Sequence, residues 1–196
     1  MDRNSITRED RAGTATGTGA ATGAATGAAP AGGRGGGSVW AVTVEPYTTA
    51  DATRLRRAYY AEIAGRYWKR SVTEAEIDQG MLHFPADGLR PPTGNFVVGR
   101  LDGRPLACGG IVLLDPATAE LTRIYVDSSA RGTGGGAALL AALEEEARAM
   151  GAERMRLDTR TDLVEARALY ARHGYREIPA YNSGPYAQHW FEKPLV

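Results

Sequence analysis

The chain has 196 residues, of which 43% are hydrophobic and 23% are charged. Its 23 Lys and Arg residues balance its 23 Asp and Glu residues, so the formal net charge is zero. This balance excludes a protein that binds nucleic acid through a broad basic surface, and it gives no reason to expect binding to anionic lipid. We therefore expect neither nucleic acid nor a membrane as a partner.

A single cysteine, Cys108, excludes an internal disulfide framework and a structural zinc site built on two or more cysteines. The three histidines lack metal-ligand spacing, so we expect no metal. Cys108 lies in an apolar segment and is expected to be a buried, unreactive thiol. The segment from Met1 to Arg11 lacks the apolar core of a signal peptide, and the expected compartment is the cytoplasm.

The N-terminal part of the chain differs sharply in composition from the rest. Ten Gly, nine Ala and five Thr fill 24 of the 26 positions in 12–37. Such a segment buries too little apolar surface to offset the conformational entropy lost on ordering. We predict a disordered tail over residues 1–37 and one α/β domain over residues 38–196.

The domain is predicted to begin with a strand and two helices. Residues 39–44 are rich in β-branched and aromatic side chains, which is typical of a strand. Apolar residues then recur at three- and four-residue spacing from Leu55 to Tyr67, which predicts a helix. Thr73 and Glu76 have the spacing of a capping box and predict a second, short helix.

Three antiparallel strands are predicted next, at 95–101, 105–114 and 119–126. Asp102-Gly103 is a strong hairpin pattern between the first two of these strands. Gly109-Gly110, inside the second strand, predicts a bulge or a close approach of another segment.

The C-terminal part is predicted to contain a helix at 135–150, a short strand at 155–158, a helix capped by Asp162, and closing strands at 175–178 and 189–191. This order predicts a mixed, mostly antiparallel central sheet of about 6–7 strands with helices on both faces.

The most informative segment is V-D-S-S-A-R-G-T-G-G-G-A, from Val126 to Ala137, which joins a strand to a helix. The first turn of a helix has unpaired N–H groups and a partial positive charge, and glycines allow a ligand to approach them. Arg131 adds a cationic donor beside them. We therefore predict a site for a phosphate or pyrophosphate.

The loop fits one nucleotide-binding motif in part and lacks the defining residues of another. Gly132, Gly134 and Ala137 fit the dinucleotide pattern G-x-G-x-x-G/A, but five residues separate the strand end at Val126 from the first glycine. Only 60 residues follow Gly136, too few to complete a doubly wound fold. A P-loop is excluded because no Gly-Lys-Ser/Thr follows. Tight binding of NAD would favour the dinucleotide alternative.

A second interpretation comes from a family resemblance. The residues R-G-T-G-G-G, at 131–136, match the pattern Q/R-x-x-G-x-G/A, and the strand E-L-T-R-I-Y-V precedes them. The segment A-R-A-L-Y-A-R-H-G-Y, at 166–175, is similar to A-x-x-L-Y-x-x-x-G-F/Y, and F-E-K-P-L at 191–195 is similar to a closing strand. In these motifs and in element order, residues 38–196 resemble the GNAT acetyltransferase superfamily.

The resemblance implies acetyl-CoA as the acetyl donor and a primary amine of a small molecule or peptide as the acceptor. It implies that the main chain of three residues binds the pantetheine arm, namely Ile124, Tyr125 and Val126. It further implies that the loop N–H groups bind the pyrophosphate, from Arg131, Gly132, Thr133, Gly134, Gly135, Gly136 and Ala137. In the family, the strand that ends at Val126 and the next strand splay apart to admit the donor.

Two residues receive catalytic roles from the resemblance. Tyr170 corresponds to the tyrosine that contacts CoA and donates a proton or hydrogen bond to the departing sulfur. Glu120 has the offset of a glutamate general base in one branch of the superfamily, although an exposed strand-edge glutamate is an equal alternative. Leu163 stands where many members have an Asn that binds the CoA arm; either Asp162 or Thr161 replaces that Asn, or the bond is missing in this chain.

The acceptor side is less well defined by the sequence. In the family, the first two helices cover the acceptor. Residues on these helices and in the loop around Pro179–Pro185 are expected to form an aromatic wall of the acceptor pocket, or else they are ordinary core and turn residues: Tyr59, Tyr60, Tyr67, Trp68, Tyr181, Asn182 and Tyr186. Arg123 is either a contact for an acidic group or a solvated surface residue. The alternative function is a non-catalytic sensor of the same fold that binds acyl-CoA. Because members of the family often form dimers, a homodimer is one possible oligomeric state of this chain.

Overall fold

The computed structural model describes residues 39–195; the tail predicted over 1–37 lies outside the described residues. The elements in chain order are β1 (Trp40–Val44), α1 (Ala50–Trp68), α2 (Glu74–His83), β2 (Gly94–Leu101), β3 (Arg104–Asp115), β4 (Thr118–Val126), the short 3₁₀ helix η1 (Ser128–Ala130), α3 (Gly135–Ala149), β5 (Arg154–Thr159), α4 (Val164–Arg172), β6 (Arg176–Ile178) and β7 (His189–Pro194).

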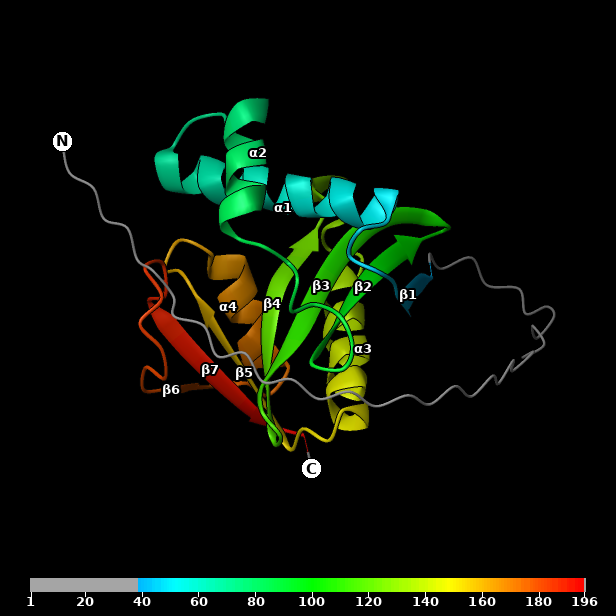
Figure 1. The fold of residues 1–196 in the computed structure, drawn as a ribbon, viewed down its shortest axis with the longest axis vertical. Coiled ribbons are helices and arrows are strands. Elements are labelled where there is room, and N and C mark those ends of the chain that lie inside the picture. The colour runs from blue at the N-terminus through cyan, green and yellow to red at the C-terminus, as the bar shows by residue number, and fades with distance from the viewer. Residues whose placement is uncertain (1–38, 196) are drawn as a thin grey trace, which may run out of the picture. The chain divides into compact units, whose positions relative to one another are not determined.

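The strands form one mixed sheet with the order β1-β2-β3-β4-β5-β7-β6 (Figure 1). Strands β4 and β5 run parallel, and the other neighbouring pairs are antiparallel. The predicted fold class, a mostly antiparallel sheet with helices on both faces, is confirmed.

Helices cover both faces of the sheet because its strands alternate buried side chains. In β2, Phe96 and Val98 belong to a core that includes Leu55 of α1. Val97, between them, belongs to a second core that includes Leu139 of α3. Successive side chains of a strand point to opposite faces, so α1 and α3 lie on opposite sides of the sheet. Burial on both faces explains the apolar run Phe96-Val97-Val98 in β2.

Strands β4 and β5 pair over a short stretch and then diverge. Their ladder has three rungs, and Glu120 opposite Arg156 is the last of them. From Leu121 to Val126, β4 continues to pair with β3, while β5 pairs on its other side with β7. A gap therefore opens between β4 and β5, and Glu120 stands at its closed end.

A bulge in β4 accompanies this divergence. The β3–β4 register shifts between Cys108 and Gly110, and Arg123 on β4 has a left-handed φ of 56°. A long side chain rarely adopts this conformation outside a bulge or turn. A Cβ on Gly109 would lie 2.5 Å from the Ile124 side chain, so the close approach predicted for this glycine pair is confirmed.

The two helix caps predicted from the sequence have different outcomes. The capping box of Thr73 and Glu76 is present at the start of α2. The predicted cap by Asp162 is wrong, because the N-cap position of α4 is Leu163 and no side chain caps it. The Asp162 carboxylate instead accepts hydrogen bonds from Arg160 Nε at 2.8 Å and Nη2 at 2.7 Å. A bidentate charged pair is stronger than a cap, which explains the difference.

Candidate active site

The glycine-rich loop between β4 and α3 is open to ligands at two positions. Gly132 and Gly134 have φ values of 78° and 93°, and a Cβ at either would meet no atom within 4 Å. Gly134 is the N-cap of α3 and provides no side chain to accept from the first-turn N–H groups. These donors, at the positive end of the helix dipole, are available to an anion.

The other two glycines of the loop serve packing. A Cβ on Gly135 would lie 2.6 Å from the Trp40 ring, and one on Gly136 would lie 2.9 Å from Leu169. Trp40 also donates its indole N–H to the Thr133 carbonyl oxygen at 3.1 Å and to its hydroxyl at 3.0 Å. The start of α3 is therefore held against both β1 and α4, which keeps its amide groups in a defined position.

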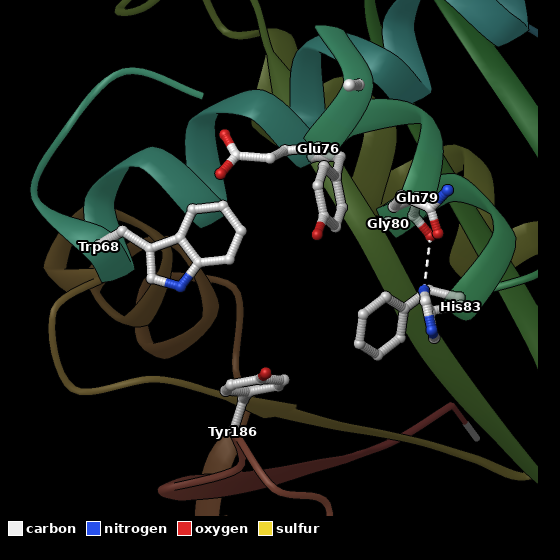
Figure 2. Close-up of a pocket in the computed structure, with 9 residues that line it drawn as sticks. Trp68, Glu76, Gln79, Gly80, His83 and Tyr186 are labelled. Carbon is white, nitrogen blue, oxygen red and sulfur yellow. Dashed lines mark hydrogen bonds between the residues drawn. The ribbon is translucent and has the colours of Figure 1, made fainter. Parts of the chain in front are cut away.

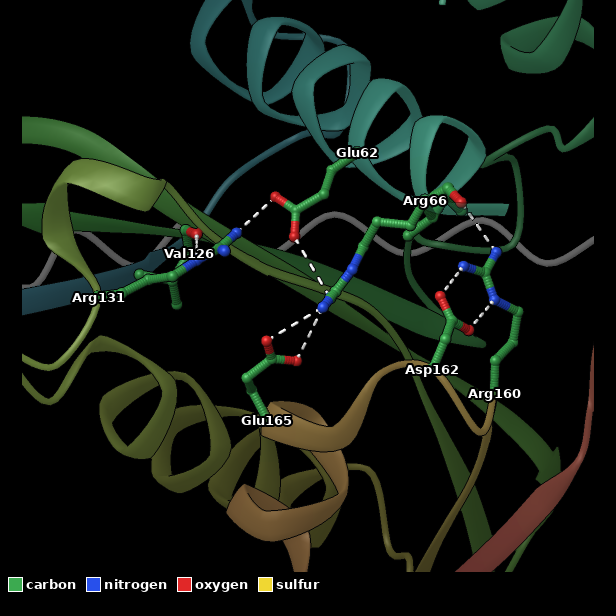
Figure 3. A network of polar contacts seen from close by, with 8 residues as sticks. Glu62, Arg66, Val126, Arg131, Arg160, Asp162 and Glu165 are labelled. Atoms are coloured by element: carbon green, nitrogen blue, oxygen red, sulfur yellow. Dashed lines mark hydrogen bonds and ion pairs between the residues drawn. The ribbon is translucent and has the colours of Figure 1, made fainter. Parts of the chain in front are cut away.

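Arg131, the first residue of the motif, is already engaged in this structure. Its Nε donates to the Val126 carbonyl oxygen at 3.1 Å, and its guanidinium forms an ion pair with Glu62 of α1. Arg66 lies 3.9 Å from Glu62 and 3.0 Å from Glu165 of α4 (Figure 3). This network connects the loop to α1 and α4. Glu62, Arg66 and Glu165 lie outside the glycine motif, and no local sequence pattern predicts that they contact it.

Glu120 lies in a half-buried polar cluster at the closed end of the gap. The Tyr181 hydroxyl donates to its Oε1 at 2.9 Å. Burial raises the pKa of Glu120 above its ordinary value, the nearby Asp158 charge raises it further, and the bond from Tyr181 partly opposes them. A carboxylate with a raised pKa is a better proton acceptor at neutral pH than an exposed one. Glu120 is thus more than an exposed strand-edge residue.

The loop before β7 reaches this cluster through a chain of hydrogen bonds. Asn182 Nδ2 donates to Asp158 Oδ2 at 2.7 Å, and Trp190 Nε1 donates to Asn182 Oδ1 at 2.8 Å. Arg156 stacks over the Tyr181 ring at 5.4 Å. These bonds hold the loop that carries Tyr181 close to Glu120. The two residues are 61 positions apart in sequence, so no local pattern predicts their contact.

Tyr170 of α4 is 6% exposed, and its ring packs against Tyr175 at 5.8 Å and Phe191 at 6.2 Å. Burial raises the pKa of its phenol, and nearby Tyr59 and Asp158 raise it further. The phenol therefore stays protonated at neutral pH. It is better suited to donating a hydrogen bond than to complete proton transfer, because its acidity is weaker than that of a free phenol.

Between α1, α2 and the loop before β7 lies a cavity of about 420 Å³ (Figure 2). It is lined by Tyr60, Trp68, Ala75, Glu76, Gln79, Gly80, His83, Phe84 and Tyr186. Three residues of the expected aromatic wall are among them, and Tyr67 packs edge-on against Tyr186 at 5.3 Å. Phe84, which has no distinguishing signal in the sequence, also lines the cavity.

Other predictions concern single groups and the chain as a whole. Cys108 is fully buried, as expected, and burial raises the pKa of its thiol to about 12. Within residues 39–195, no three His, Cys, Asp or Glu side chains gather as metal ligands do. In the same part of the chain, no helix has both the length and the apolar composition needed to cross a membrane.

Comparison with known proteins shows the relationships of the chain. Residues 53–175 match the model of the acetyltransferase (GNAT) family. The chain is 33% identical over 112 residues to an IAA acetyltransferase of Azospirillum brasilense, which covers 55% of this chain and 72% of that protein.

Solved structures show the same fold. A Klebsiella pneumoniae protein assigned as an acyl-CoA N-acyltransferase has a TM-score of 0.61 and 29% identity, covering 80% of this chain and 98% of that one. A GNAT family acetyltransferase of Elizabethkingia anophelis with acetyl-CoA bound has a TM-score of 0.54 and 15% identity, covering 79% and 97%. The family match, the splayed parallel pair and the glycine loop agree, and this chain belongs to the GNAT acetyltransferase family and is an acyltransferase.

Proposed function

We propose that this enzyme transfers the acetyl group of acetyl-CoA directly to a primary amine of a small molecule or peptide. The observation that carries the proposal is the position of Glu120, a half-buried carboxylate with a raised pKa at the last rung before β4 and β5 part. A carboxylate placed in this way is suited to removing a proton from an amine at the gap in which the family binds its donor.

The residues around the gap fit acetyl-CoA, which supplies the acetyl group as a thioester. The open space at Gly132 and Gly134 and the uncapped first turn of α3 fit a diphosphate. Ile124, Tyr125 and Val126 lie on the part of β4 that has no β5 partner, where main-chain groups remain for the pantetheine arm. The Val126 carbonyl oxygen accepts from Arg131 and would first have to be released.

The chain's own groups can manage the protons of the reaction. Glu120 accepts a proton from the acceptor nitrogen, directly or through water, as the nitrogen forms its bond to the acetyl carbon. A main-chain N–H of β4 stabilises the carbonyl oxygen as it becomes negative. The Tyr170 phenol donates a hydrogen bond to the sulfur as the carbon–sulfur bond breaks. The thiolate then takes a proton from solvent, and Glu120 returns to solvent the proton that it accepted from the nitrogen.

Replacing Tyr170 by Phe is expected to lower kcat by about 10- to 100-fold with little change in acetyl-CoA affinity. A hydrogen bond to a group that becomes charged contributes about 1.5–3 kcal/mol, and this one strengthens only as the sulfur leaves. Steady-state kinetics and calorimetric titration with acetyl-CoA measure the two quantities. Tyr175→Phe is the matched control, because its hydroxyl contacts Met155 inside the core. An unchanged kcat in Tyr170→Phe would remove this role.

Replacing Glu62 by Gln is expected to tighten acetyl-CoA binding by about twofold to fivefold. Glu62 competes with the diphosphate for Arg131, and a surface ion pair contributes at most about 1 kcal/mol. Calorimetric titration at low and high salt measures the effect, which salt should weaken. Glu145→Gln removes the same charge from an exposed position on α3 and should leave the affinity unchanged. Weaker binding in Glu62→Gln would contradict competition for Arg131.

The test of the proposed function is CoA release in the presence of a panel of amines, with acetyl-CoA binding measured on the same sample. Release that depends on an amine, with an N-acetylated product identified by mass spectrometry, is the expected result. Normal acetyl-CoA binding without release from any amine would instead identify a sensor of the same fold.

A further inference from the structure

We infer that the acceptor amine also carries a carboxylate, and that Arg123 and Arg56 bind this group in the acceptor site. The inference rests on the proposed function and names the substrate class of the same site. It is carried by two guanidinium groups that have no carboxylate partner among residues 39–195. Within the same range, Arg56 has a buried Nε without a hydrogen-bond partner, and the Arg123 side chain donates only to the carbonyl oxygens of Phe84 and Pro85.

The bulge in β4 directs Arg123 toward the acceptor side. Leu121 and Ile124 on either side of it pack into the core beneath α3, whereas Tyr125 packs into the core beneath α1. The left-handed conformation of Arg123 inserts one residue and sends its side chain to the α1 face, where Nη2 donates to the carbonyl oxygens of Phe84 at 3.1 Å and Pro85 at 2.9 Å. Its Nε and Nη1 donors form no further hydrogen bond within residues 39–195.

Arg56 lies on α1, one helical turn before Tyr60, which lines the cavity between α1, α2 and the loop before β7. Its guanidinium stacks over the Tyr47 ring at 5.2 Å, and its buried Nε has no hydrogen-bond partner. The charge of Asp87 influences Arg56, but Asp87 accepts a hydrogen bond from the Tyr47 hydroxyl at 2.7 Å and forms no ion pair with Arg56. A buried polar atom without a partner calls for a specific explanation, and an absent ligand is one.

The positive charges of Arg56 and Arg123 are partly removed from water without an opposite charge to compensate them. Burial lowers the pKa of both guanidinium groups, and Arg123 lowers that of Arg56 further. Two other arginines that are withdrawn from solvent have carboxylate partners: Arg100 pairs with Glu45 and Asp51, and Arg160 pairs with Asp162. Among the described residues, Arg167 on α4 also has a buried Nε without a hydrogen-bond partner, so it is Arg56 and Arg123 together that indicate a ligand. Removing a charge from water is compensated when an opposite charge is bound. A planar carboxylate matches the donor geometry of guanidinium groups and supplies this charge.

The position of the pair relative to Glu120 defines the acceptor further. Arg123 follows Glu120 by three residues on β4, so their Cα atoms are separated by roughly 10 Å at most along an extended strand. Both side chains extend on the α1 face, where Asp158 adds a second negative charge near Glu120. Negative groups at one end and positive groups at the other complement a zwitterion, which is the charge pattern of an amino acid.

The test compares acceptors that differ only in the carboxylate. L-Phenylalanine, L-phenylalaninamide and phenethylamine form one set, and L-leucine, L-leucinamide and 3-methylbutylamine form another. In CoA release by the full chain, we expect kcat/KM for the carboxylate member to exceed that of its partners by about 10-fold or more in at least one set, as befits charge-assisted hydrogen bonds. This comparison needs no variant, so it does not depend on the folding of a mutant.

Variants then identify the groups responsible. In Arg56→Gln we expect the ratio of kcat/KM between acid and amide to fall to below about threefold, and in Arg56→Lys, which keeps the charge, to take an intermediate value. Arg104→Gln removes a guanidinium from the exposed start of β3 and should keep the wild-type ratio. Circular dichroism of each variant verifies that it is folded.

The outcomes separate the two proposals. Acetylation of amides and simple amines at the same kcat/KM as acids, or a ratio unchanged in Arg56→Gln, would overturn the inference and leave the proposed function in place. Acetyl-CoA binding without CoA release from any member of either set or from the wider amine panel would overturn the proposed function, and the inference with it.

Discussion

Replacement of Glu120 by Gln is expected to lower kcat by about 10²- to 10⁴-fold, the usual contribution of a general base. The carboxylate must be ionised to accept a proton, so wild-type activity should fall as the pH decreases through the pKa of Glu120. This pKa is raised by burial above the ordinary value of 4.5. The acidic limb of the pH–rate profile should therefore lie above pH 4.5 and should disappear in Glu120→Gln.

A matched carboxylate distinguishes a base from a residue that only positions others. Glu146 on α3 accepts a hydrogen bond from Asn95 at 2.7 Å, and Glu146→Gln should keep both the rate and the profile. Wild-type kcat and an unchanged acidic limb in Glu120→Gln would show that another group accepts the proton.

Stability provides an independent readout of the same variant. A carboxyl group whose pKa is higher in the folded chain binds its proton more tightly there than in the unfolded chain. Its contribution to the free energy of unfolding therefore decreases as the pH rises from 4.5 through the folded pKa. At neutral pH, Glu120→Gln should unfold at the same temperature as wild type or higher, whereas a purely structural glutamate would lose stability when replaced.

Replacement of Gly134 by Val is expected to weaken acetyl-CoA binding by about 100-fold or more. The protein itself leaves open space around this Cβ position, so the added side chain occupies only the volume proposed for the diphosphate. Each lost hydrogen bond to a charged group contributes about 1.5–3 kcal/mol, and two such bonds account for the effect. Calorimetric titration with acetyl-CoA measures the change in Kd.

The strain introduced by valine at a positive φ must be separated from the loss of binding. Gly103, in the hairpin between β2 and β3, has a φ of 81° and also has no atom within 4 Å of a Cβ. Gly103→Val should therefore lose a similar stability, about 1–2 kcal/mol, while it keeps the affinity for acetyl-CoA. Wild-type affinity in Gly134→Val would overturn the assignment of this loop.

Much of the fold was accessible from local patterns. The order of elements follows from the spacing of apolar residues, the hairpin from Asp102-Gly103, and the start of α2 from Thr73 and Glu76. These features depend on backbone preferences and on neighbours a few residues apart, which a single sequence contains directly. The cap predicted at Asp162 failed because Arg160, two residues before it, offered its carboxylate a stronger partner.

The sequence by itself determined the glycine-rich loop in which we propose an anion site, since the first turn of a helix and its glycines are adjacent in the chain. Only the tertiary structure decided how the other groups are paired: that Arg131 meets Glu62, that Tyr181 donates to Glu120, and that Arg123 in the bulge donates to the Phe84 and Pro85 carbonyl oxygens. Each of these contacts joins residues far apart in sequence, and it depends on the strand register and on the angle at which β4 leaves β5. Side-chain charge is encoded residue by residue, whereas its burial and its partners are set by how the whole backbone packs.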